Sequence, residues 1–107
     1  MMSAKSAEFL AACEKRRTNY ALGDARIISD EEISKIVHTA VKHCPTAFNA
    51  QGSRIVLLLN QDHKDLWEDI VKPAVKAVAP AEAWPNTSQK LDGFKAAYGT
   101  VRPWCLF

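Results

Sequence analysis

The sequence predicts a mixed α/β (α+β) fold in which helices outnumber strands. A capping box, Ser29 with Glu32, opens a stretch whose apolar residues recur at helical spacing, so an amphipathic helix is expected to end near His43, before Pro45. Segment 54–60 is apolar without alternation, which indicates a strand covered on both faces. A chain of 107 residues is one domain at most.

Three further helices are expected. Segment 4–17 has an apolar face and a basic end, and segment 63–78 has an apolar face that Pro73 should kink or split. The last helix is capped by Thr87 and ends at Gly99. Helices therefore account for most of the chain.

The expected sheet is too small for its central strand. A second strand follows the last helix, and Pro103, which cannot donate to a sheet ladder, interrupts it after Val101. A two-stranded sheet is marginal by itself, and a strand as apolar as 54–60 needs neighbours on both edges. Either another subunit completes the sheet, or the sequence is part of a larger domain.

Composition excludes several function classes. The formal charge is +2, from 14 basic and 12 acidic residues that are interleaved, so neither nucleic acid nor a membrane surface is an expected partner. No apolar run approaches the roughly 20 residues that span a bilayer. The three cysteines form no CxxC pair, and the histidines do not share a helix face, so no metal site is expected. A cytoplasmic location is expected, with the nucleus as an alternative.

Four quoted segments carry a family resemblance. They are FLAACEKRRTNYAL, ISDEEISKIVHTAVKHCPTAFNAQGSRIVLLL, HKDLWEDIVKPAVKAVAPAEAW and FKAAYGTV. Together they resemble the nitroreductase family, most closely the fungal and bacterial subgroup whose turn usually reads P-S-A-F-N-S-Q. The resemblance covers about residues 8–101, and the tail 102–107 departs from it. It implies that 1–107 is a single partial domain, the N-terminal part of a three-layer α-β-α sandwich.

The resemblance also implies a function. Family members are homodimers that bind FMN at the subunit interface and pass hydride from NADH or NADPH, by a ping-pong cycle, to nitroaromatics, quinones or similar small-molecule acceptors. Because the flavin carries the reactive atom, no catalytic side chain is expected. One matching segment holds the FMN phosphate and ribityl chain, and a turn reaches the same flavin from the other subunit. The implied cofactor-binding residues are Arg16, Arg17 and Thr18 in the segment, and Pro45, Thr46, Ala47, Asn49 and Gln51 in the turn.

These residue types suit that chemistry. A phosphate favours fixed cations with several donors, and an Arg guanidinium can bind it in bidentate fashion. Side-chain amides such as those of Asn49 and Gln51 can donate and accept at a ring edge that bears both kinds of group. The polar turn would then form a wall of the flavin site, and the apolar strand behind it would hold that wall rigid.

Plainer interpretations stay open. Arg16 and Arg17 close a helix, where cations meet the negative end of its dipole. Asn49 and Gln51 can serve only as turn residues that bond locally. Family members are about twice as long, so the alternatives to an active enzyme are a truncated, catalytically inactive fragment and a small interaction module.

Overall fold

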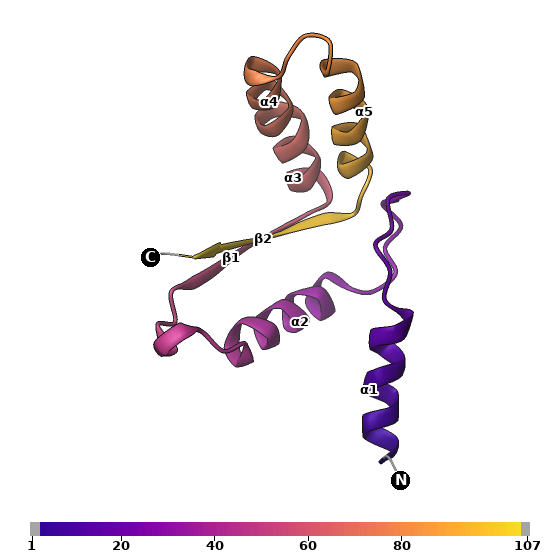
Figure 1. Ribbon diagram of the computed structural model, residues 1–107, viewed down its shortest axis with the longest axis vertical. Helices are drawn as coiled ribbons and strands as arrows, with labels where there is room; N and C mark the ends of the chain where they lie inside the picture. The colour runs from indigo at the N-terminus through magenta and orange to yellow at the C-terminus, as the bar shows by residue number, and fades with distance from the viewer. Residues whose placement is uncertain (1–2, 106–107) are drawn as a thin grey trace.

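The computed structural model describes residues 3–105 as helices around one small sheet (Figure 1). The chain is extended, with a radius of gyration of 17.5 Å, whereas a compact domain of 100 residues has about 13 Å. The elements in chain order are α1 (Ala4–Lys15), α2 (Asp30–His43), the 3-10 turn η1 (Ala47–Asn49), β1 (Ser53–Leu59), α3 (Asn60–Asp65), the π-helical segment η2 (Leu66–Val71), α4 (Lys72–Val78), α5 (Trp84–Lys95) and β2 (Gly99–Cys105).

The sheet contains β1 and β2 paired antiparallel. The strand predicted to stop after Val101 continues to Cys105, and Pro103 pairs with Ile55, so that prediction was wrong. A proline is tolerated on an edge strand, where its nitrogen can face away from the partner. The sheet begins at Gly99, where a Cβ would lie 2.5 Å from Leu59 Cδ2, so only glycine fits this close approach.

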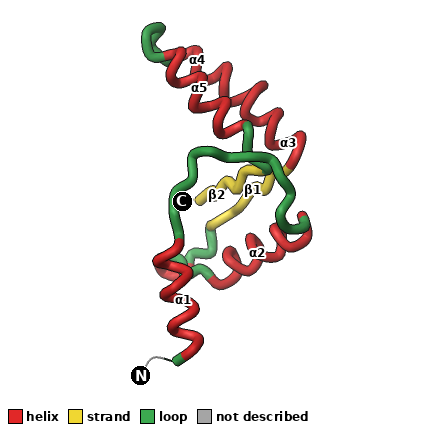
Figure 2. Tube along the Cα trace, turned by 90° about the vertical axis from the view of Figure 1, so that its right-hand side faces the viewer, coloured by secondary structure: helices red, strands yellow, loops and turns green. Residues whose placement is uncertain are grey.

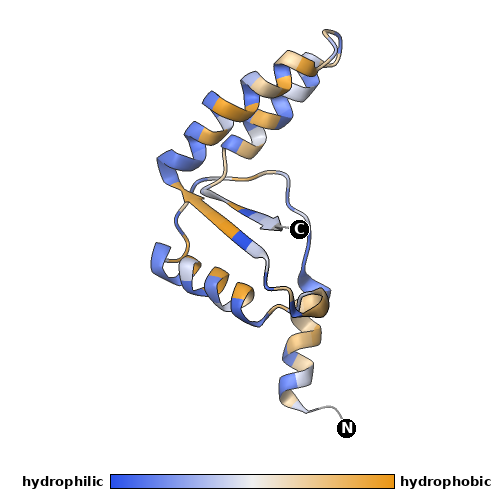
Figure 3. Cartoon of the chain, turned by 90° about the vertical axis from the view of Figure 1, so that its left-hand side faces the viewer, coloured by the Kyte–Doolittle hydropathy of each residue, from blue (hydrophilic) through white to orange (hydrophobic). Residues whose placement is uncertain are grey.

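The apolar strand β1 is only half covered. After Ser53 and Arg54, the rest of the strand is continuously hydrophobic (Figure 3), and helix α2 packs against β1. None of its residues is buried, and Val56 is exposed, so the prediction of cover on both faces was wrong for this chain. The reason is that the described elements supply no second sheet neighbour and no helix layer on the other face. Figure 2 shows a long loop, 16–29, running past the strands between α1 and α2.

Helix α2 matches its prediction. Ser29 Oγ accepts the Glu32 backbone N–H at 3.1 Å, and the Glu32 carboxylate accepts the Ser29 N–H at 2.9 Å, which completes the capping box. The helix ends at His43, because Pro45 disfavours helical backbone in the residue before it. Local chemistry at both ends therefore determines this helix.

Four other helix boundaries differ from expectation. Helix α1 ends at Lys15, before residue 17, and α3 already begins at Asn60. Helix α5 begins at Trp84 rather than at Thr87, since Pro85 fits the first turn of a helix, and it ends at Lys95 rather than at Gly99.

Pro73 widens a turn of its helix instead of ending it. The helical run continues from α3 through η2 into α4, and the Lys72 N–H bonds to the Trp67 carbonyl, five residues back. Since Pro73 has no N–H and its ring crowds the preceding turn, a π turn directly before it relieves the conflict. The disturbance predicted at this proline takes that form.

The core lies where α3, η2, α5 and β2 meet. Among residues 3–104, whose burial the structure describes, only His63, 1% exposed, and Leu91, 8% exposed, are buried. The Trp67 ring lies 5.2 Å from that of Phe94 and 6.4 Å from that of His63. The run from α3 to α4 and the helix α5 form a helical hairpin, and an ion-pair network, here called the hairpin network, joins its two arms. The network consists of Glu68, Lys72, Asp92 and Lys95, with nitrogen–oxygen distances of 2.7 to 3.8 Å. None of the described helices is long and apolar enough to cross a membrane.

Candidate functional site

The turn between α2 and β1 has an unusual backbone. Phe48, Asn49 and Gln51 all have positive φ, of 53°, 54° and 52°. Asn tolerates this left-handed region, whereas for other non-glycine residues it costs about 1–2 kcal/mol each. Such a conformation persists only where the surroundings enforce it, and it is frequent at functional sites.

Hydrogen bonds within the turn enforce this conformation. Thr46 Oγ1 accepts the Gln51 backbone N–H at 3.1 Å, and the Asn49 N–H bonds to the Thr46 carbonyl at 3.0 Å. From the strand side, Arg54 Nη1 donates to the Gln51 and Ser53 carbonyls at 3.1 and 3.0 Å. The turn is therefore fixed from both ends.

The same turn lines a recess of about 330 Å³ between the end of α2 and the start of β1. Gln51 Nε2 donates to Asn49 Oδ1 at 3.1 Å, which leaves the side-chain atoms Asn49 Nδ2 and Gln51 Oε1 able to bind a ligand. The lining residues are Val41, Lys42, Cys44, Thr46, Asn49, Gln51, Ser53 and Arg54.

Three of the five predicted turn residues thus meet at one recess. Pro45 and Ala47 belong to the turn without lining the recess. Sequence reasoning left two cations of the recess, Lys42 and Arg54, out of the predicted site. The position of Arg54, three residues after Gln51, was the available signal.

The other predicted segment lies at the end of α1. The Arg16 N–H bonds to the Ala12 carbonyl at 3.1 Å, and Arg17 Nη1 donates to the Glu14 and Arg16 carbonyls at 2.6 and 2.8 Å. Arg17 therefore satisfies the last carbonyls of the helix, which is the plainer of the two interpretations of this residue. The side chains of Arg16, Arg17 and Thr18 are exposed.

The structure does not bring the two predicted segments together within one chain. Figure 1 shows the C-terminal end of α1 and the turn η1 at opposite ends of α2. A single ligand that contacted both segments would have to lie between two copies of the chain, or the chain would have to rearrange.

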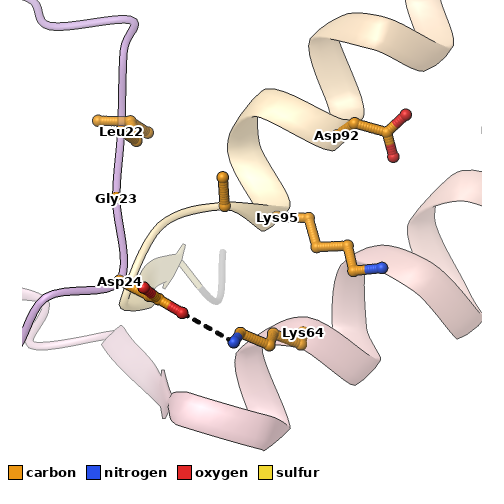
Figure 4. A pocket seen from close by; sticks show the side chains of 7 residues that line it. Leu22, Gly23, Asp24, Lys64, Asp92 and Lys95 are labelled. Atoms are coloured by element: carbon orange, nitrogen blue, oxygen red, sulfur yellow. Dashed lines mark hydrogen bonds and ion pairs between the residues drawn. The ribbon is translucent and has the colours of Figure 1, made fainter.

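A second recess, of about 480 Å³, lies away from all of these residues (Figure 4). Lys64 lies 3.0 Å from Asp24 there, and this hydrogen bond and charge lower the pKa of the Asp24 carboxyl. The other two charged residues of this recess belong to the hairpin network, so its cations are already paired. The lining residues are Leu22, Gly23, Asp24, Lys64, Asp92, Lys95 and Ala96.

Comparisons with known proteins agree on one family. Residues 13–101 match the profile of the nitroreductase family. The nitroreductase FRM2 of Saccharomyces cerevisiae is 32% identical over 95 residues, which cover 87% of this chain and 46% of that protein. HBN1 of the same yeast is 38% identical over 71 residues, which cover 62% of this chain and 35% of that protein.

A solved structure has the same arrangement of elements. The nitroreductase CinD from Lactococcus lactis, in complex with nicotinic acid, is 40% identical and superposes with a TM-score of 0.75 over 91% of this chain and 48% of its own. The helices and the small sheet described above therefore form an α+β nitroreductase-like fold, as predicted.

The chain belongs to the nitroreductase family. The matched residues include both predicted segments, at Arg16 and at Asn49. The chain spans about half the length, or less, of the relatives it matches.

Proposed function

We propose that the chain provides an FMN-binding half-site of an NAD(P)H-dependent oxidoreductase that reduces nitroaromatics, quinones or similar small acceptors. The observation that carries the proposal is that the family match includes both predicted segments while Thr46, Asn49 and Gln51 line one recess. The membership itself supports an oxidoreductase of nitroreductase type.

The residues of the recess fit such a cofactor. The side-chain amides of Asn49 and Gln51 are joined by a hydrogen bond, and their remaining groups, Asn49 Nδ2 and Gln51 Oε1, can donate to and accept from a flavin ring edge. Their rigid backbone reduces the entropy lost on binding. When bound, FMN supplies the hydride chemistry, and this chain's residues bind and orient it.

The cations of the first segment fit a phosphate. Arg16 makes no side-chain hydrogen bond or ion pair within residues 3–105. Its guanidinium can therefore bind an anion without giving up an existing partner. Arg17 would exchange two neutral helix carbonyls for anionic phosphate oxygens, which attract a guanidinium more strongly and can be bound in bidentate fashion. Thr18 adds a hydroxyl beside them.

The proposed assembly is a homodimer. The two segments lie apart in one copy (Figure 1), so the segment of one copy and the turn of the other would enclose each flavin. NADH or NADPH is the proposed electron donor. Structures of the relative CinD hold 4-nitrophenol and chloramphenicol, which supports aromatic nitro compounds as the proposed acceptors. The proposed setting is the cytoplasm.

FMN titration tests this function. The purified chain is mixed with FMN and desalted, and its flavin absorbance and its mass in solution are measured together. We expect flavin on a dimer, and about 10- to 100-fold weaker FMN binding in Arg17→Ala, because one charge-assisted bond contributes about 1.5–3 kcal/mol. Lys5→Ala, which removes an exposed basic residue from α1, the helix that ends at Lys15, serves as the control. A dimer that retains no flavin would exclude the proposed cofactor role.

A second candidate is a non-catalytic role, as an inactive fragment or an interaction module. The small core and the many exposed large side chains favour it, since such surface marks a protein that binds another. This candidate predicts that the chain binds no FMN under the same titration and that its solubility depends on a protein partner.

A further inference from the structure

Four exposed side chains share one face of the two-stranded sheet. Arg54 pairs with Trp104, and Val56 pairs with Arg102, in the antiparallel register of β1 and β2. Paired residues point to the same face of a sheet, and so do residues two apart along a strand. All four are exposed, Val56 to 43% and Trp104 to 60%. We call this group the arginine–tryptophan face.

Helices cover other parts of the sheet but leave this face open. Thr100 lies on the same face nearer the start of β2, where it bonds to His63 and Trp67 of the helical hairpin. Figure 1 shows that α3 to α5 rise from that end of the strands. On the opposite face Ile55 and Leu57 are half-buried, because α2 packs against β1. The open part of the sheet is therefore the end that carries the two arginines.

The two arginines give this face a positive charge that no carboxylate balances. Among the residues that the structure describes, Arg102 makes no side-chain hydrogen bond or ion pair. Arg54 keeps its full charge, since its two hydrogen bonds go to the neutral carbonyls of Gln51 and Ser53. Neither β1 nor β2 contains an acidic residue. An apolar partner would bury two unpaired charges at a high cost, so the face suits an anion.

Trp104 adds a flat apolar surface between the two charges. It lies opposite Arg54 on the partner strand, and it follows Arg102 by two residues, which is roughly 7 Å along the strand. Within residues 3–105 its ring stacks on no other ring and contacts no cation. An exposed indole stacks planar rings, and a guanidinium binds a carboxylate in bidentate fashion.

We propose that the arginine–tryptophan face binds a small planar aromatic carboxylate, with its ring on Trp104 and its carboxylate on Arg102. The spacing selects this class of ligand, because the distance between the two side chains matches a carboxylate attached directly to a ring. A nucleotide carries a ribose between its base and its phosphate, so its charge would extend past Arg102. A neutral ring would not use the arginines, and an aliphatic acid would not use the indole.

This site is separate from the recess proposed for the flavin. Arg102 and Trp104 follow residue 101, where the match to the nitroreductase family ends, and neither side chain lines that recess. Arg54 is the one residue of the face that also lines the recess. Binding to the face requires no flavin, so its test and the test of the proposed function are independent.

Equilibrium dialysis of the whole chain against 4-nitrobenzoate, without FMN, tests the site. We expect saturable binding of one ligand per chain. Binding of 4-nitrobenzamide, which lacks the charge, and of cyclohexanecarboxylate, which lacks the planar ring, should each be about 10-fold weaker or more. Adenosine monophosphate should also bind more weakly. No binding of 4-nitrobenzoate, or equal binding of all four compounds, would overturn the proposal.

Three variants locate the bound ligand. Arg102→Thr and Trp104→Val should each weaken the binding of 4-nitrobenzoate about 10-fold or more, and both replacements are residues that favour strands, so β2 should still pair. Arg26→Thr is the matched control, since it removes the same charge from an exposed position in loop 16–29 and should leave the binding unchanged. Equal losses in Arg26→Thr and Arg102→Thr would show attraction by net charge alone and refute the site.

Nuclear magnetic resonance of the unmodified chain gives a readout that does not depend on how well the variants fold. The indole N–H signal that Trp104→Phe removes belongs to Trp104, and 4-nitrobenzoate should shift it more than the signals of Trp67 and Trp84. A larger shift at either of those two residues would place the ligand elsewhere and contradict the proposal. So would a loss of binding in Arg17→Ala but not in Arg102→Thr, since the ligand would then occupy the arginines that end α1.

Discussion

Replacing Thr100 by valine should destabilise the fold far more than its surface exposure suggests. Thr100 Oγ1 lies 2.8 Å from His63 Nδ1 and 3.0 Å from Trp67 Nε1, and His63 Nε2 lies 3.2 Å from the Lys95 carbonyl. Because the Lys95 carbonyl can only accept a hydrogen bond, His63 Nε2 must be the donor and carries the proton. Thr100 then accepts from the indole and donates to Nδ1, which links three elements around the most buried side chain.

Valine keeps the shape and the β-branching but removes both bonds. His63 is 1% exposed, so water cannot replace its lost partner, and an unsatisfied buried group costs about 1–3 kcal/mol. The half-buried indole of Trp67 loses a bond with a net contribution of about 1 kcal/mol. The total of roughly 2–4 kcal/mol should lower the melting temperature by about 8 °C or more in a chain of this size.

Urea unfolding followed by circular dichroism measures this loss. Thr39→Val is the matched control, because Thr39 is exposed on α2 and threonine and valine have similar helix propensities. In a Trp67→Phe background, Thr100→Val should cost about 1 kcal/mol less, since one of the two bonds is already absent. If Thr100→Val and Thr39→Val unfold within about 0.5 kcal/mol of each other, the argument for this network is wrong.

Three further outcomes follow from cap and charge contacts. Glu32→Ala should lower the urea midpoint at neutral pH, because it removes the carboxylate that accepts the Ser29 backbone N–H. That backbone hydrogen bond lowers the folded pKa of Glu32, so the contribution of this carboxylate is present above the ordinary Glu pKa and is lost as pH falls through the folded pKa; an equal cost of Glu32→Ala at low and neutral pH would contradict it. In Tyr98, the bond donated to Asp30 raises the phenol pKa, so phenolate absorbance should develop at higher pH than in a control peptide, and Tyr98→Phe should lose its stability cost as pH rises through the folded pKa. Lys72→Met should lower the urea midpoint at low salt and much less in concentrated salt, and a salt-independent effect would show that packing, not charge, stabilises the hairpin network.

The elements predicted correctly are those set by local chemistry. Helix α2 follows from its capping box and from Pro45, and β1 follows from its apolar run. The continuation of β2 through Pro103 depends on which edge of the sheet stays open, and a single strand does not encode that. The start of α5 was missed because Thr87 was taken as the cap, whereas Pro85 already suits the first turn.

The candidate site divides in the same way. The turn residues were predicted from a motif, and Thr46, Asn49 and Gln51 do line one recess. The bonds from Arg17 to its own helix and the full exposure of Phe48 depend on how the chain lies in space, so no local pattern gave them. The two segments could share a flavin only in an assembly of two copies, which the sequence of one chain does not describe. That they share one therefore stays a prediction.

The backbone of the turn explains why a polar turn directly precedes an apolar strand. Left-handed conformations at Phe48 and Gln51 lower the stability of the chain, and they persist because Thr46 fixes the turn on one side and Arg54 on the other. Arg54 lies within β1, so the paired strand supplies the rigidity that the turn needs. A turn that only connected a helix to a strand would not need this strain, because glycine adopts positive φ at a lower cost in free energy. The cost is reasonable if the turn must hold two amides toward a ligand outside the chain.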